Sequence, residues 1–183
     1  MADIKHRIDV VGMAQPTAST CWLASYKMLL KAAGQPYTDD AIRARLQLFN
    51  VGWDDAMANG LDGKDWSRAA FALGFAPMIP QQYKSNSGFL DTLWGRTTGQ
   101  KAFLALLAKA PLWIGRYVGK GKSHAVIARG YDSWDDKVVW INPQAEAGKD
   151  AVESRSKLDL FIGMIAYPMG GVQFSAFHAA AAA

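Results

Sequence analysis

Cysteine is almost absent from this chain, and its scarcity limits what the protein can be. Cys21 is the only cysteine among 183 residues, so no internal disulfide can form. The three histidines, His6, His124 and His178, are far apart in the sequence. No group of cysteines and histidines therefore has the spacing of metal ligands, and we expect no metal site.

Long apolar runs are also absent. No run reaches the roughly 18 residues that a membrane-spanning helix needs. Residues 1–10 lack the apolar segment of a secretory signal peptide. We therefore expect no membrane contact, and a protein that is cytoplasmic or is exported by a route that reads no N-terminal signal.

Charge of one sign is not concentrated anywhere. The 20 Lys and Arg residues are scattered among 16 Asp and Glu residues, giving a formal net charge of +4. This pattern argues against nucleic-acid binding. Hydrophobic residues make up 50% of the chain, which is typical of a globular protein with a core. Without repeats or low-complexity linkers, we expect one domain over 1–178 and an uninformative tail over 179–183.

The two halves of the chain differ in their patterns. Helices are predicted over 19–33, 41–49, 62–71, 88–94 and 100–108, with Ser19 or Thr20 as the first N-cap and Gly34 as a stop. Strands are predicted over 8–11, 112–118, 125–131, 138–141 and 160–166. This segregation predicts an α+β fold. A helical lobe over about 19–110 would pack against a sheet lobe over about 111–170 that includes the N-terminal strand.

Cys21 has the position of a reactive thiol. It falls in the first turn of the helix predicted over 19–33, where free N–H groups and the helix dipole lower the pKa of a thiol. The apolar residues Trp22, Leu23 and Tyr26 would anchor this helix and so fix the sulfur. The alternative is a small buried hydrophobic residue, a frequent role of free cysteine.

Gln15 favours the reactive interpretation. Acyl transfer to sulfur develops negative charge on the carbonyl oxygen, which needs hydrogen-bond donors aimed at it. The backbone N–H of Cys21 can supply one donor. The side-chain amide of Gln15, in the proline-containing loop before the helix, can supply the second. The alternative for Gln15 is a solvent-facing loop residue.

A histidine and an asparagine lie on one predicted β-hairpin. Strand-like runs over 122–131 and 137–142 flank a turn-rich stretch. A turn centred on 133–134 sets Asn142 opposite His124 or opposite the residue two positions further on. Both polar side chains then emerge on one face. Asn142 would accept from one ring nitrogen of His124 and leave the other to face the sulfur.

Plainer roles remain open for these residues. His124 could be a half-exposed strand residue and Asn142 a turn residue before Pro143. Asp132 is a rival orienting group, although at the turn it should point to solvent. The run 119–123 resembles a phosphate-binding loop, but the position that needs glycine is Arg116 and a strand follows. No nucleophile-elbow pattern surrounds a serine.

The candidate residues sit within six short motifs, at 15, 21–25, 111–113, 123–126, 130–132 and 141–143. Their order and the Gln-x5-Cys-Trp spacing resemble the papain-like cysteine protease superfamily. The chain is most similar to its compact bacterial members, the avirulence-protease type of plant pathogens and the bacteriocin-leader-processing type. The resemblance covers roughly residues 8–145.

This resemblance implies peptide-bond hydrolysis through a thioester acyl-enzyme, without a metal or another cofactor, in a cleft between the two lobes. It implies that Cys21 and His124 form a thiolate–imidazolium pair, that Asn142 orients the imidazole, and that Gln15 donates to the oxyanion. The Cys-Gly-Ser-Cys-Trp run of lysosomal and plant enzymes is absent. Some compact bacterial members carry Asp in place of Asn142.

The expected partner is a protein or peptide substrate, and a cognate inhibitor or immunity protein is compatible with the resemblance. A bacterial secreted effector or toxin fits the motifs, as does a cytoplasmic processing enzyme. Three other functions stay open: an amidase of cell-wall peptides, a deamidase or acyltransferase that uses the same triad, and a non-catalytic binding module with the same fold.

Overall fold

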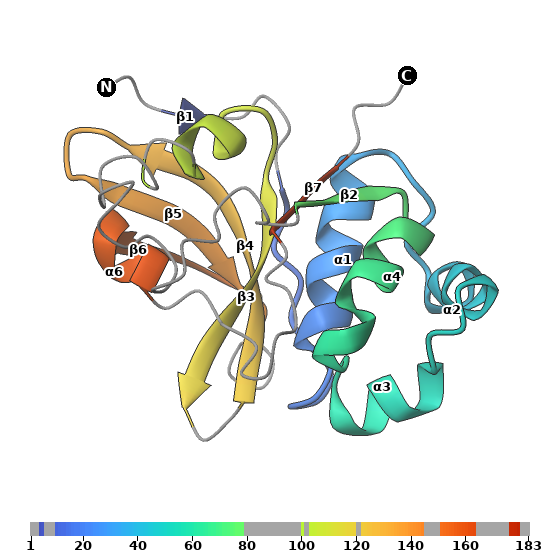
Figure 1. Cartoon of the computed structure of the whole chain (residues 1–183). Helices are drawn as coiled ribbons and strands as arrows, with labels where there is room; N and C mark the ends of the chain where they lie inside the picture. Colours follow the sequence, from blue (N-terminus) through green and yellow to red (C-terminus); the bar gives the residue numbers. More distant parts are fainter. Residues whose placement is uncertain are drawn as a thin grey trace, which may run out of the picture.

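Helices and strands are segregated along the chain, as the sequence predicts, and the fold is α+β (Figure 1). The structure is a computed structural model that describes residues 4–5, 10–78, 100, 103–119, 122–144, 151–163 and 176–179. The N-terminal part is helical, with α1 (Cys21–Ala32), α2 (Asp39–Leu48), α3 (Trp53–Asn59), the 3-10 helix η1 (Gly63–Asp65) and α4 (Trp66–Ala72).

Local signals in the sequence determine where these helices begin and end. Thr20 is the N-cap of α1, and Gly34, just beyond its end, has a φ of 66°, a conformation that glycine adopts without strain. The Thr38 side chain accepts a hydrogen bond from the backbone of Ala41 and caps α2. Gly74, with a φ of 79°, follows α4. The sequence did not predict α3.

The strands form one antiparallel sheet. They are β1 (Ile4–Lys5), β2 (Phe75–Met78), β3 (Leu112–Gly119), β4 (Lys122–Asp132), β5 (Lys137–Asn142), β6 (Val152–Lys157) and β7 (Ala176–Ala179). Their order among the described residues is β2-β7-β3-β4-β5-β6, and β1 pairs with β4. The predicted strands that correspond to β3, β4 and β5 are confirmed.

Two predicted strands are wrong. Residues 160–163, at the start of the run predicted as a strand over 160–166, belong to the helix α6 (Leu158–Gly163). Its buried residues, Leu158, Phe161 and Ile162, have helical spacing, and a short apolar run does not separate the two alternatives. Of the strand predicted over 8–11, Val10 and Val11 are not in a strand, and the N-terminal strand lies at Ile4–Lys5.

Two further helix predictions have different outcomes. The helix predicted over 88–94 lies outside the described residues. The helix predicted over 100–108 is helical over 103–107, where its described residues are continuous.

Both faces of the central sheet are buried because its side chains alternate between two cores. One core joins α1 to one face, through Trp113, Ala125, Ile127 and Ile141. The other core joins α6 and the segment 103–107 to the opposite face, through Leu112, Ile114, Val126, Ala128, Val138 and Trp140. Figure 1 shows α1 to α4 on one side of the sheet and α6 on the other.

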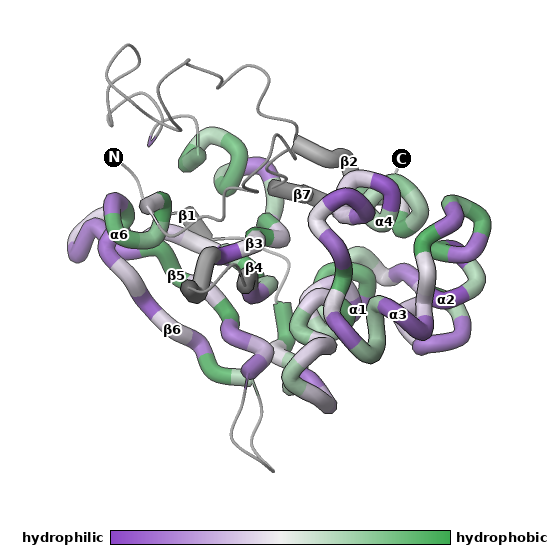
Figure 2. Tube along the Cα trace, turned by 60° about the horizontal axis from the view of Figure 1, so that its bottom comes forward, coloured by the Kyte–Doolittle hydropathy of each residue, from purple (hydrophilic) through white to green (hydrophobic). Residues whose placement is uncertain are grey.

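Helix α1 is buried in the molecule, and helices α2 and α3 lie at its surface. Nine of the 12 residues of α1 are buried, whereas α2 buries only Ile42 and Leu46 and α3 buries only Ala56. In Figure 2, hydrophilic residues accordingly recur along α2 and α3. The position of Cys21 is therefore set by a helix that is enclosed by its neighbours.

Aromatic side chains join the helical layer to the sheet. Tyr26 of α1 stacks on Trp113 of β3 and on Phe75 of β2, with ring centroids 5.5 Å and 5.7 Å apart. Trp66 of α4 meets Trp113 edge to face at 5.2 Å, where Gly115 leaves room for its ring. Each such pair contributes about 0.5–1.5 kcal/mol beyond its buried area, so these contacts help to hold α1 against β3.

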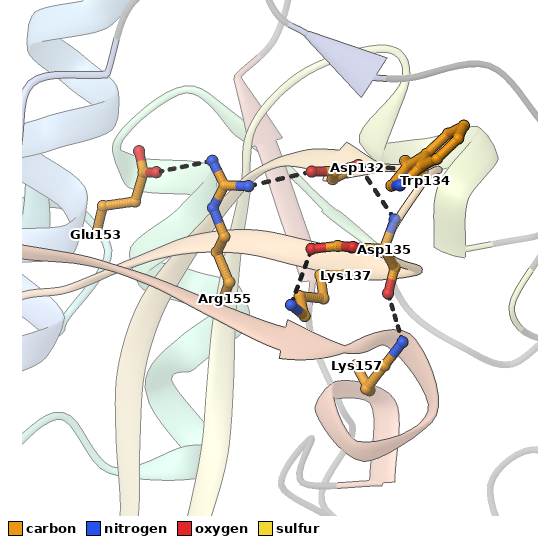
Figure 3. Close-up of polar contacts among 7 residues, drawn as sticks. All are labelled: Asp132, Trp134, Asp135, Lys137, Glu153, Arg155 and Lys157. Atoms are coloured by element: carbon orange, nitrogen blue, oxygen red, sulfur yellow. Dashed lines mark hydrogen bonds and ion pairs between the residues drawn. The ribbon is translucent and has the colours of Figure 1, made fainter.

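The turn between β4 and β5 is braced by charged side chains from three strands (Figure 3). Asp132 accepts hydrogen bonds from the backbone of Trp134 and Asp135, at 3.1 Å and 3.4 Å, and one from Arg155 at 3.1 Å. Lys157 donates to the carbonyl of Asp135 at 2.6 Å. These contacts fix the pairing of β4 with β5, and with it the positions of the polar residues at the far end of the hairpin.

Candidate active site

Cys21 is the first residue of α1, and its sulfur rests against β4. The backbone N–H of Ala125 donates to Sγ at 3.4 Å, so the sulfur lies beside the residue that follows His124. The backbone N–H groups of Cys21 and Trp22 also act to lower the pKa of the thiol. The residue is 9% exposed. The start of α1 thus offers N–H donors to the sulfur, as its position in the sequence predicts.

Burial nevertheless raises the pKa of the Cys21 thiol above its ordinary value. The N–H groups of Ala125, Trp22 and Cys21 itself oppose this shift, and desolvation outweighs them. The sequence-based expectation that the helix terminus lowers this pKa therefore holds for the direction of the helix contribution but not for the net shift. The thiol is protonated at neutral pH.

His124 and Asn142 are joined directly by a hydrogen bond. The distance from Nε2 of His124 to Oδ1 of Asn142 is 2.7 Å, and the same oxygen accepts from the backbone of Gln144 at 3.0 Å. Because an amide oxygen only accepts, Nε2 carries the hydrogen in the neutral ring. Nδ1 is then the unprotonated nitrogen of His124, with a lone pair able to take a proton. Asp132 instead braces the β4–β5 turn.

The pKa of His124 is lowered, first by burial and then by the positive charge of Arg116, while the hydrogen bond to Asn142 opposes the shift. Arg116 is the cross-strand partner of His124 on β3. Its guanidinium lies over the rings of Trp140 and Phe161, with 4.3 Å and 5.6 Å to the ring centroids. The imidazole is therefore neutral at neutral pH.

The structure places the sulfur of Cys21 against Ala125, the residue that follows His124. Cys21 and His124 both lie in the described part of the chain, and their described hydrogen bonds do not include one between Sγ and the ring. The directions of both pKa shifts oppose an ion pair at rest.

Gln15 lies beside the end of β5. Its backbone N–H donates to the carbonyl of Pro143 at 2.8 Å, which ties the loop before α1 to the residue after Asn142. Its side-chain Nε2 donates to the carbonyl of Thr17 at 2.7 Å, and a second hydrogen on Nε2 is left for another acceptor. The sulfur of Cys21 thus lies against β4, which carries His124. Gln15 lies beside Pro143, which follows Asn142.

A pocket with a volume of about 620 Å³ includes Cys21 and Ala125 in its wall. Three tryptophans from the helical layer and the sheet line it: Trp22, Trp66 and Trp113. The remaining wall comes mainly from α3 and the loop before η1, including Asp55, Asn59, Gly60, Leu61, Asp62 and Gly63. No motif in the sequence predicted this wall. The only local signal was Gly60 and Gly63, which bracket a loop.

The described residues contain neither a cluster of metal ligands nor a membrane-spanning helix. No three His, Cys, Asp or Glu side chains gather there as metal ligands. None of the helices in those ranges has the length and apolar character of a membrane span.

Comparison with known protein families gives a match over residues 4–158, to the family described as papain-like cysteine protease AvrRpt2. A search of curated proteins gave no match. The matched range spans most of the chain and includes Gln15, Cys21, His124 and Asn142. The chain therefore belongs to the papain-like cysteine protease family that is described as AvrRpt2.

Proposed function

We propose that this chain hydrolyses peptide bonds, with Cys21 as nucleophile and His124 as general base and acid. Asn142 orients the imidazole, and Gln15 donates to the oxyanion. The observation that carries the proposal is the placement of the only cysteine against the strand residue next to a histidine whose Nε2 is bound by an asparagine. Membership of a cysteine protease family supports it.

Acylation begins when a peptide carbonyl reaches the sulfur. Nδ1 of His124 takes the thiol proton while Sγ attacks the carbonyl carbon, and the carbonyl electrons move onto its oxygen. The backbone N–H of Cys21 and the amide of Gln15 donate to this oxyanion. The imidazolium then gives its proton to the leaving nitrogen, the C–N bond breaks, and an acyl thioester remains on Cys21.

Hydrolysis of the thioester reverses these roles. His124 takes a proton from water as the oxygen adds to the acyl carbon, and the same donors bind the second oxyanion. The C–S bond then breaks, the acid product leaves, and the proton on His124 returns to the sulfur. The neutral resting pair fits this cycle because every proton taken by Nδ1 is returned within the same half-reaction.

The pocket beside Cys21 is the proposed seat of the substrate. Its lining, which includes Trp113 of β3 and the loop after α3, supports an active site between the helical and sheet layers. Protein or peptide substrates fit the family assignment. The family name supports a role as a secreted effector that acts on another protein. A cognate inhibitor or immunity protein is compatible with that role.

Cleavage of fluorescein-labelled casein tests the proposal. Cys21→Ala and His124→Ala should abolish cleavage. Asn142→Ala should weaken it less, and Gln15→Ala should lower the rate on the order of 10²-fold, as for loss of one oxyanion donor. Thermal unfolding of each variant controls for folding. Full cleavage by either Cys21→Ala or His124→Ala would rule out the mechanism.

The same variants separate the alternative activities. In one experiment peptidoglycan replaces casein as the substrate. In another, a mass increase of about 1 Da in a candidate protein would report deamidation. If either experiment shows activity that depends on Cys21, and neither casein nor a peptide library is cleaved, the proposed activity would be that of an amidase or a deamidase and not of a peptidase.

A further inference from the structure

One backbone carbonyl organises the loop between Gln15 and α1. The carbonyl oxygen of Thr17 accepts three hydrogen bonds: from Nε2 of Gln15 at 2.7 Å, from Oγ1 of Thr20 at 3.0 Å, and from the backbone N–H of Thr20 at 3.2 Å. The residue that precedes the nucleophile and the side chain proposed as oxyanion donor thus share one acceptor.

Thr20 uses its hydroxyl in an unusual way for an N-cap residue. An N-cap threonine normally accepts from a backbone N–H of the first helical turn. Here the side chain makes no such bond, although Thr20 stands at the N-cap of α1. Its Oγ1 instead accepts from the backbone of Thr17 at 3.0 Å and donates to the carbonyl of the same residue. The side chain is fully buried, so water does not compete for these bonds.

We propose that Thr20 is a positioning residue that sets the Gln15 amide relative to the backbone N–H of Cys21. The inference rests on the proposed function, in which these two groups bind the oxyanion. The hydroxyl of Thr20 fixes the Thr17 carbonyl, and that carbonyl holds one hydrogen of the Gln15 amide. The other hydrogen is thereby given a defined direction.

The loop is anchored independently of this hydroxyl. Gln15 is tied to Pro143 through its backbone, and Oγ of Ser19 donates to the carbonyl of Met57 at 2.7 Å. Removing the Thr20 hydroxyl should therefore loosen the Thr17 carbonyl and the amide bound to it, while both ends of the loop stay in place. Such a variant should change the direction of the Gln15 amide without displacing the loop.

Acyl transfer from p-nitrophenyl acetate to Cys21 is the test, because it forms an oxyanion without requiring a particular peptide. In Thr20→Val the acylation rate should fall about 10-fold, less than on complete loss of the donor. Alkylation of Cys21 by iodoacetamide, which forms no oxyanion, should proceed at the rate of the unchanged protein. Thr20→Ser, which keeps the hydroxyl, should restore acylation.

A double variant distinguishes positioning from general damage. If Thr20 acts through Gln15, Thr20→Val should cause no further loss in a Gln15→Ala background. Thr38→Val is the matched control, because it removes a hydroxyl at the N-cap of α2. It should lower the melting temperature and leave acylation unchanged. Thr20→Ala, which leaves space for water, replaces valine if Thr20→Val does not fold.

Each outcome decides the question. Acylation by the Thr20 variant at the unchanged rate, or a full 10-fold further loss on top of Gln15→Ala, would overturn the role of Thr20 and leave the proposed mechanism standing. Slower alkylation by iodoacetamide in the Thr20 variant would also overturn it, because the sulfur itself would then be disturbed. If the unchanged protein shows no acylation that depends on Cys21, the proposed function fails and the inference fails with it.

Discussion

At the scale of single residues, burial controls the protonation of the site. It raises the pKa of Cys21 and lowers the pKa of His124, and in each case it is the largest contribution. Both shifts favour the uncharged form, since desolvation penalises charge of either sign. The hydrogen bond that Nε2 of His124 donates to Oδ1 of Asn142 partly opposes the shift of the His124 pKa. Burial therefore favours the uncharged thiol of Cys21 and the uncharged imidazole of His124.

The lowered pKa of His124 predicts a loss of stability in mild acid. Between the folded-state pKa and the ordinary value of about 6.5, the unfolded chain binds more protons at this residue than the folded protein does. The free energy of unfolding should therefore fall as the pH falls below about 6.5. His124→Gln should lose this contribution. Melting temperatures at pH 7.5 and 5.5, measured for both proteins, check it.

The comparison of the two proteins isolates His124 from the other titrating groups. The unchanged protein should lose more stability between the two pH values than the variant. An equal loss in both would mean that His124 does not titrate with a lowered pKa in the folded protein.

At the scale of elements, the β4–β5 hairpin carries two of the candidate residues, and its turn sets their register. Asp132 pairs with Lys137 across the turn, and Ile127 pairs with Ile141 near the other end, with a register shift between Ala128 and Gly130. The alignment of His124 with Asn142 at the open end depends on both features. A contact far from the site thus contributes to its geometry.

Asp132→Ala should weaken this hairpin. It removes two bonds to the turn backbone and the pair with Arg155, and we expect a loss of about 1–2 kcal/mol in the free energy of unfolding. Urea denaturation measures the change. Asp54→Ala is the control, because its carboxylate is exposed and lies 3.8 Å from Arg43, and it should cost less than about 0.5 kcal/mol. Equal effects of the two changes would contradict the role of Asp132.

The sequence was sufficient where a signal was local. Thr38, Gly34 and Gly74 mark helix ends, and a high content of Val, Ile and aromatic residues identifies β3, β4 and β5 as strands. The sequence was insufficient where contacts with distant segments determine whether a segment is a helix or a strand. The sequence of β6, Val-Glu-Ser-Arg-Ser-Lys, forms a strand because it pairs with β5. The segment α6 forms a helix whose buried residues pack against one face of the sheet. Tertiary context overrides weak local preference in both cases.

The site shows the same division. Cys21, His124, Asn142 and Gln15 could be predicted as candidates because the helix start and the hairpin are local features, and their catalytic roles stay predictions. The net pKa shift of the thiol depends on burial by distant segments, which spacing does not reveal. The same holds for the Thr17 carbonyl, whose three donors come together only in the folded loop.

At the scale of the whole molecule, the contact between the helical layer and the sheet has little spare room. A Cβ at Gly115 would lie 2.6 Å and 2.8 Å from two ring atoms of Trp66. That tryptophan is buried, donates to the carbonyl of Leu61 at 3.0 Å, and packs against Trp113. The ring therefore cannot move without disturbing the pocket wall.

Gly115→Ala should lower the free energy of unfolding by about 1–3 kcal/mol, as for overpacking in a core. Because Trp66 and Trp113 line the pocket, cleavage of casein should fall as well. Gly163→Ala is the matched control, since a Cβ there meets nothing within 4 Å. Urea denaturation of the two variants checks the difference. An unchanged stability of Gly115→Ala would show that the layers adjust freely.

The split of the candidate residues between the two layers has a consequence for inactivation. His124 and Asn142 belong to adjacent strands of one sheet and stay together as long as that sheet persists. Cys21 belongs to the helix packed on its face and meets the sheet through noncovalent contacts alone. Any stress that moves α1 off the sheet, including mild heat, would therefore stop the proposed catalysis while the strands remain paired, so activity would report the packing of the two layers more sensitively than a measure of secondary structure.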